Sequence, residues 1–85
     1  MDSARVDEIV QNLRDQGQVS TDAYRQIHGK LIHILHDPRG GGNEGEYDFP
    51  FLNRQGQMQH DYNLAGHRFA MVEEDADTWR YIEGG

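Results

Sequence analysis

The segment HRFAMVEEDADTWRYIE, residues 67–83, decides how the chain folds, because it holds two alternating runs on either side of an acidic turn. Alternation of polar and apolar residues with a period of two is typical of β-strands, and residues 74–77 supply the polar side chains that favour a reverse turn. The segment therefore predicts an antiparallel hairpin formed by residues 67–73 and 78–83.

The register of this hairpin determines which of its side chains face the core. With a turn of four residues, Glu74 to Asp77, Val72 lies opposite Trp79, and Tyr81 points to the same side of the sheet. The opposite side is more uniformly apolar, so we expect it to cover the helices. It carries Met58, His60, Phe69, Met71 and Ile82. Trp79 and Tyr81 are then expected on the outer face.

Two further alternating runs precede this hairpin and extend the sheet. They are built on Tyr47, Phe49 and Phe51 and on Met58, His60 and Tyr62. With short turns between the runs, residues 47–83 are predicted to form an antiparallel meander. Pro50 lacks a backbone N–H and is tolerated mainly at sheet margins, so we expect its strand to lie at an edge.

The first part of the chain has the spacing of amphipathic helices instead. Apolar side chains recur at i, i+3, i+4 and i+7 on Val6, Ile9, Val10 and Leu13. A helix is therefore expected over about residues 3–16, with Gly17 as its stop. A second helix is expected over residues 20–37, which either Ser20 or Thr21 can cap and which Pro38 terminates. So short a connection predicts an antiparallel helical hairpin.

These elements predict an α+β fold, in which an N-terminal antiparallel helical hairpin packs on a C-terminal three- to four-stranded antiparallel β-meander. A glycine-rich linker over residues 39–46 joins the two parts. With 85 residues and 35% hydrophobic content, the chain can build one modest core. We therefore expect residues 1–85 to form a single domain.

Composition excludes several classes of protein. The chain has no cysteine, which rules out disulfides, thiolate zinc sites and cysteine nucleophiles and fits a reducing compartment. No apolar stretch approaches the roughly 20 residues of a membrane span, and the N-terminal residues lack the apolar run of a signal peptide. We expect a cytoplasmic protein with no membrane association.

The formal net charge of −7 is distributed unevenly along the chain. Residues 1–39 carry a net charge of −1, and residues 40–85 carry −6. Such a field repels phosphate backbones and attracts cations, which disfavours nucleic-acid binding and favours a protein partner with a basic surface. An acidic surface that serves only solubility is the simpler explanation.

Three of the five histidines lie in the stretch HGKLIHILHD, which begins at His28. At about 100° per residue, His33 and His36 share the outer side of the predicted helix, whereas His28 borders its apolar stripe. We expect His28 to be partly buried and hydrogen-bonded. Two exposed imidazoles make a weak chelate, because zinc sites need three or four protein ligands. His60 or His67 could complete a site if the sheet packed nearby, but the spacing alone predicts no metal and no cofactor.

The sequence does not favour catalysis. The only serines, Ser3 and Ser20, lie where helix caps belong, and a capping hydroxyl bonds to backbone N–H groups. His60 and Asp61 are neighbours, so their side chains point to opposite faces of a strand. Residues 9–20 have the cadence of a first helix and turn in helix-turn-helix regulators, although the second helix then continues unbroken.

The sequence thus predicts a small acidic, non-catalytic interaction or inhibitor protein that binds a basic partner surface through its sheet. The expected site sets aromatic anchors among acids and comprises Val72, Glu73, Glu74, Asp75, Asp77, Trp79 and Tyr81. The alternatives are a histidine-mediated metal-binding protein and a helix-turn-helix-like DNA-binding regulator. A homodimer that covers Trp79 and Tyr81 is the competing explanation of the same aromatic residues.

Overall fold

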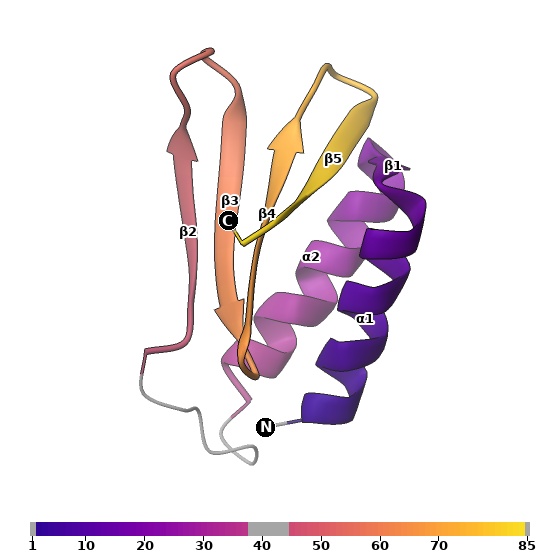
Figure 1. Ribbon diagram of the computed structural model, residues 1–85, viewed down its shortest axis with the longest axis vertical. Coiled ribbons are helices and arrows are strands. Elements are labelled where there is room, and N and C mark those ends of the chain that lie inside the picture. The colour runs from indigo at the N-terminus through magenta and orange to yellow at the C-terminus, as the bar shows by residue number, and fades with distance from the viewer. Residues whose placement is uncertain (1, 38–44, 85) are drawn as a thin grey trace.

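The computed structural model describes residues 2–37 and 45–84, and in this part of the chain two helices lie on one face of a five-stranded antiparallel sheet (Figure 1). The elements are α1 (Ser3–Gln16), β1 (Gln18–Ser20), α2 (Thr21–Leu35), β2 (Tyr47–Leu52), β3 (Met58–Leu64), β4 (His67–Glu73) and β5 (Thr78–Glu83). The strand order is β1-β5-β4-β3-β2. The predicted α+β class is confirmed, but the sheet has one strand more than the three to four expected.

Both helices begin and end where local chemistry favours it. The Asp2 side chain accepts a hydrogen bond from the first turn of α1, and Gly17 closes this helix with a φ of 75°. The Ser20 side chain accepts a hydrogen bond from the backbone N–H of Ala23, so the cap of α2 is Ser20 and not the alternative, Thr21. Most of the linker expected over residues 39–46 lies outside the described residues. Within those residues, neither helix is long and apolar enough to cross a membrane.

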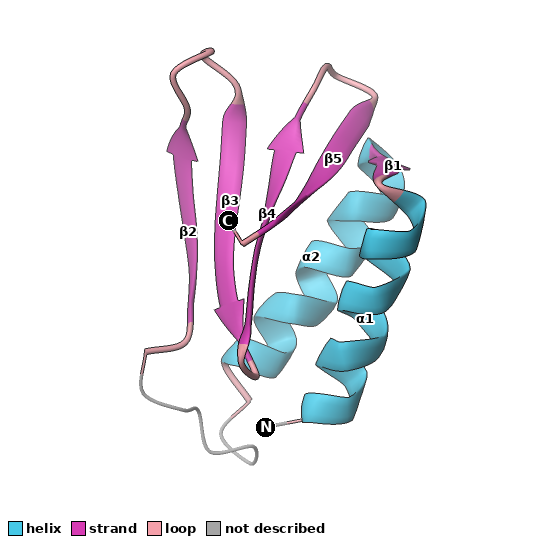
Figure 2. Cartoon of the chain, viewed as in Figure 1, coloured by secondary structure: helices cyan, strands magenta, loops and turns pink. Residues whose placement is uncertain are grey.

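The connection between the helices is a strand rather than a turn. Val19 pairs with Trp79 in antiparallel register, and the Gly17 carbonyl accepts a hydrogen bond from the Tyr81 N–H. Val19 is buried, as a hydrophobic residue directly before a helix cap often is. The helices therefore lie side by side in opposite directions, as expected, but the segment that joins them forms one edge of the sheet (Figure 2).

The hairpin of β4 and β5 differs from its predicted register by one residue. Glu73 pairs with Trp79, and the Glu74 N–H donates to the Thr78 carbonyl, which leaves three residues in the loop instead of four. The Asp75 carboxylate holds this shorter loop, because it accepts hydrogen bonds from the Asp77 N–H and the Thr78 hydroxyl. A change of one residue moves every β5 side chain to the other face.

The core consequently contains the Trp79 ring, which was expected on the outer face of the sheet. Met58, His60, Phe69 and Met71 face the helices as predicted, but Ile82 lies on the opposite face and Trp79 takes its place. The largest fully buried side chains are those of Val6, Val10, Leu13, Leu31, Tyr62, Leu64, Phe69, Met71 and Val72. All of these except Val72 belong to the cluster between the helices and the sheet.

Neither of the two described helices covers the other face of the sheet, which is called the open face here (Figure 1). Its β2 side chains are Tyr47, Phe49 and Phe51, which alternate with the helix-facing Asp48 and Pro50. β2 is the last strand of the sheet, which confirms the edge position predicted from Pro50.

Candidate functional site

The docking site expected around Trp79 does not form. Trp79 is 6% exposed and stacks on Tyr24 with ring centroids 4.1 Å apart, and Val72 is 1% exposed. The Trp79 indole nitrogen has no hydrogen-bond partner among the described residues. Tyr81 is partly buried against the core, and its hydroxyl donates to Glu83. The prediction that these rings stand exposed on an acidic platform is therefore wrong.

The acids of that predicted site lie at the end of β4 and in the loop between β4 and β5. Asp75 and Asp77 are exposed, whereas Glu73 and Glu74 are partly buried. Glu74 forms an ion pair with Arg80 and accepts a hydrogen bond from the Gln57 side chain at 3.2 Å. The Arg80 hydrogen bond lowers the pKa of the Glu74 carboxyl. These acids thus lie at the end of the sheet that carries the β2–β3 and β4–β5 loops.

Exposed aromatic side chains occur on β2 instead. Phe49 is 59% exposed and Tyr47 is 39% exposed, and the Phe49 and Phe51 ring centroids lie 5.9 Å apart. All three rings belong to the open face. We call Tyr47, Phe49 and Phe51 the aromatic column. Leu52 is 67% exposed but is the last residue of β2 and belongs to the helix-facing side.

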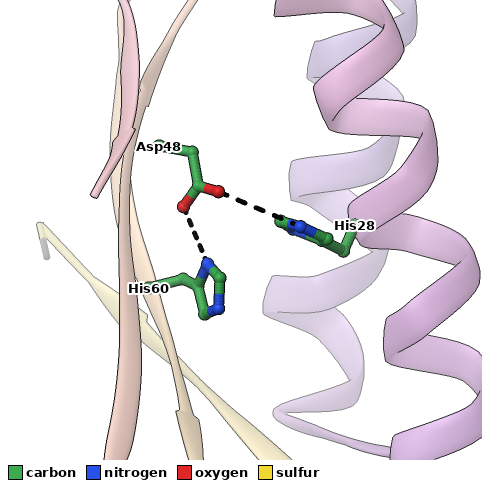
Figure 3. A group of neighbouring side chains, drawn as sticks. All are labelled: His28, Asp48 and His60. Carbon is green, nitrogen blue, oxygen red and sulfur yellow. Dashed lines mark hydrogen bonds and ion pairs between the residues drawn. The ribbon is translucent and has the colours of Figure 1, made fainter. Parts of the chain in front are cut away.

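A second group of functional side chains lies between α2 and the sheet. His28, Asp48 and His60, called the His–Asp centre here, come from α2, β2 and β3 and converge on one point (Figure 3). His60 Nδ1 lies 2.8 Å from Asp48 Oδ1, and His28 Nε2 lies 3.9 Å from Asp48 Oδ2. The two imidazole centroids are 4.9 Å apart. One ligand atom from each residue fits within 4.8 Å of the other two.

Hydrogen bonds extend the His–Asp centre into the core. The Tyr62 hydroxyl lies 2.8 Å from His28 Nδ1 and also bonds to the Tyr24 hydroxyl. Tyr24 lies one helical turn before His28, and Tyr62 lies two residues after His60 on the same face of β3. The regular spacing of one helix and one strand thus aligns two tyrosines behind two histidines.

Burial sets the protonation of this network. The Asp48 side chain is 11% exposed, and those of His60 and His28 are 17% and 31% exposed. Burial lowers the pKa of His28; the Asp48 carboxylate opposes this shift, and His60 adds to it. Burial also raises the pKa of the Tyr24 and Tyr62 hydroxyls. At neutral pH the His28 imidazole is therefore neutral and both hydroxyls keep their protons. Two imidazole nitrogens and a carboxylate oxygen are the donors that a transition metal ion prefers.

The structure separates the histidines that the sequence grouped together. His33 and His36 are exposed on α2, as predicted, and lie outside the His–Asp centre. His67 lies 2.6 Å from Asp7 of α1. His28 is partly buried and hydrogen-bonded, as expected, and His60 meets this residue rather than the exposed pair.

Sequence reasoning missed Asp48 altogether. A signal for it was present, because Asp48 stands between Tyr47 and Phe49 at a position that alternation turns toward the helices. An acid at an inward position of a strand needs a partner, since an isolated buried charge is costly. The partner could not be named from the sequence, because it depends on how α2 crosses the sheet.

Comparison of the chain with protein-family models, with curated proteins and with solved structures gave no match.

Proposed function

We propose that this protein acts by association, as a non-catalytic interaction or inhibitor protein. The open face of its sheet binds a partner protein whose surface carries basic side chains. The observation that carries the proposal is the exposure of the aromatic column, with Phe49 59% and Tyr47 39% exposed on a face that neither described helix covers. Aromatic side chains in a contiguous exposed patch are the usual anchors of protein interfaces.

The partner is expected to cover the face of β2 rather than to extend its edge. Pro50 lies in the middle of this six-residue edge strand and has no N–H to donate to an added strand. Edge-to-edge pairing is therefore disfavoured, and the rings on the open face are left as the points of contact.

The negative charge of the sheet region supports a partner with a basic surface. Residues 45–84 contain eight acids and three arginines, and one of these arginines, Arg80, is paired with Glu74. Asp61 lies directly opposite Phe49 across the β2–β3 pair, so a carboxylate and an exposed ring are neighbours on the open face. A lysine or arginine of the partner could contact both groups at once, through an ion pair and a cation–π contact.

The described hydroxyl groups of Ser20, Thr21 and Thr78 support a non-catalytic role. The Ser20 hydroxyl accepts a bond from the Ala23 N–H, and the Thr21 hydroxyl donates to the Ala76 carbonyl at 2.7 Å. The Thr78 hydroxyl donates to Asp75. All three stabilise turns or helix ends, and none of these bonds joins a hydroxyl to a histidine base.

Affinity capture with a matched pair of variants tests the proposal. Phe49→Ser removes the most exposed ring of the open face, and Leu52→Ser removes an even more exposed apolar side chain from the same strand but from the helix-facing side. A specific partner should be lost with Phe49→Ser, with affinity reduced about 30-fold, as loss of about 2 kcal/mol at an anchor implies. It should be retained with Leu52→Ser and released as salt is raised.

Three outcomes would count against the proposal. Equal capture by both variants would remove the aromatic column from the interface, and binding that is insensitive to salt would remove the basic partner. Self-association in sedimentation experiments that disappears only with Phe49→Ser would assign the open face to a homodimer instead.

A further inference from the structure

We propose that His28, Asp48 and His60 bind one divalent transition metal ion, zinc before others, and that this ion ties α2 to the β2–β3 hairpin. The proposal is independent of the docking surface, because the His–Asp centre lies on the helix-facing side of β2 and the aromatic column lies on the open face.

The donor set fits zinc better than the lighter cations. Two imidazole nitrogens and one carboxylate oxygen form a three-ligand site in which water takes the fourth position. Calcium and magnesium prefer six or more oxygen ligands, which this centre does not offer. Cobalt, nickel and copper share the preference for imidazole and serve as spectroscopic substitutes.

The distances within the centre allow one ion to reach all three residues. Zinc bonds to nitrogen and oxygen are about 2.0–2.2 Å long, so two ligands of one tetrahedral ion are about 3.3–3.6 Å apart. The His28–Asp48 separation is 3.9 Å and the Asp48–His60 separation is 2.8 Å. One ligand atom from each residue lies within 4.8 Å of the other two, so the side chains would close further on the ion as it binds.

The 3.9 Å separation between His28 and Asp48 supports an ion more than a simple hydrogen-bonded network. At this distance His28 Nε2 is too far from the carboxylate for a hydrogen bond, although both groups face the same point. Of the two described histidines that face Asp48, only His60 lies at hydrogen-bond distance from it. A network built only to neutralise Asp48 would be complete without His28, whereas a metal ion would bond to both.

The surroundings of His28 hold it in the orientation that a ligand needs. Its Nδ1 lies 2.8 Å from the Tyr62 hydroxyl, which leaves Nε2 directed at Asp48. Metal-binding histidines usually bond their second ring nitrogen to such a polar group, and loss of that group typically weakens metal binding about 10–100-fold. Tyr24 supports Tyr62 in turn.

The single tryptophan provides a local reporter of the site. The Trp79 ring lies 5.9 Å from the His60 ring. Calorimetry with zinc chloride should show one ion bound per chain, and cobalt or nickel should quench Trp79 fluorescence with the same stoichiometry. Magnesium should do neither.

Variants of the three ligands and of two exposed histidines separate the proposed site from adventitious binding. His28→Gln, Asp48→Asn and His60→Gln should each weaken zinc binding by at least about 10–100-fold, and Tyr62→Phe by about 10-fold. His33→Gln and His36→Gln change the same residue type on the exposed side of α2 and should leave binding unchanged. Zinc should raise the melting temperature of the wild type but not of Asp48→Asn.

The proposal is overturned if the wild type binds no zinc, or if binding is lost with His33→Gln or His36→Gln but retained with Asp48→Asn. Circular dichroism establishes that each variant folds. If His60→Gln fails to fold, His28→Gln carries the test, because its side chain is the most exposed of the three and its loss disturbs the core least.

Discussion

The two edges of the sheet are built for different tasks. At one edge β1 is only three residues long, yet Val19 is buried and the chain leads directly into a helix on either side. At the other edge β2 has six residues and leaves Tyr47, Phe49 and Leu52 exposed. The β1 edge therefore belongs to the core, whereas the β2 edge leaves apolar side chains exposed.

The same contrast holds for polar groups. Near β1 the inward side chains are apolar, and the stacked rings of Trp79 and Tyr24 fill the space. On β2 the inward side chains include the carboxylate of Asp48, which meets two histidines. A charged residue in this position stabilises less than an apolar one would, so its presence favours a functional role for the β2 edge.

The sharpest test of this contrast compares two aromatic residues. Trp79→Ala should lower the free energy of unfolding by about 3–5 kcal/mol, because it empties a buried site. Phe49→Ala should change it by less than about 1 kcal/mol, because the ring is exposed. Urea denaturation followed by circular dichroism measures both. Equal effects would contradict the assignment of the two faces.

A smaller effect is expected from the hydroxyl of Tyr62. Tyr62→Phe leaves the Tyr24 hydroxyl and His28 Nδ1 without their shared partner and should cost about 1–3 kcal/mol. Tyr47→Phe removes an exposed hydroxyl from the β2 edge and should be neutral within about 0.5 kcal/mol. If the two variants unfold at the same urea concentration, the tyrosine pair does not contribute to stability.

The two serines test the capping of the helices. Ser20→Ala removes the hydroxyl that caps α2 and should cost about 0.5–2 kcal/mol. Ser3→Ala should change stability little, because Asp2 rather than Ser3 caps α1. Thermal melts of the two variants give the comparison. A larger effect at Ser3 would mean that α1 begins elsewhere.

The weakest expected effect is the pH dependence of an exposed ion pair. The Arg14 side chain, which hydrogen-bonds to Glu83, lowers the pKa of that carboxyl from its ordinary 4.5. The pair therefore stabilises the folded state above this value, and its contribution is lost as the pH falls through the lowered pKa. Melting temperatures measured from pH 7 to pH 3 should fall slightly less for Glu83→Gln than for the wild type. A steeper fall in the variant would reverse the assigned sign.

Periodicity predicted most of the architecture, because both helix stripes and four of the strands repeat over several residues. α1 occupies the predicted residues 3–16, and Ser20, one of the two expected caps, caps α2. β1 was not predicted, since three residues are too short to show a period and its partner, β5, lies some 60 residues away. Only the packing of the helices on the sheet brings these segments together.

The candidate sites were less accessible to sequence reasoning. The face of Trp79 depended on whether the β4–β5 loop holds an odd or an even number of residues, and the Asp75 side chain decides this through bonds that polarity patterns do not reveal. The His–Asp centre depended on three separate elements meeting. His33 and His36 are three residues apart, which predicts neighbouring side chains on a helix surface but does not bring them to the sheet.

The pairing of β1 with β5 also bears on how the polypeptide could be divided. These strands come from opposite halves of the sequence. If the chain were cut between residues 37 and 45, Val19 and Trp79 would belong to different fragments but would still pair in the folded protein. Two separate peptides, one ending at residue 37 and one beginning at residue 45, should reassemble through this strand pair and the helix layer. Such fragments would form a split protein whose reassembly could be followed by the fluorescence of Trp79, which is buried in the folded state.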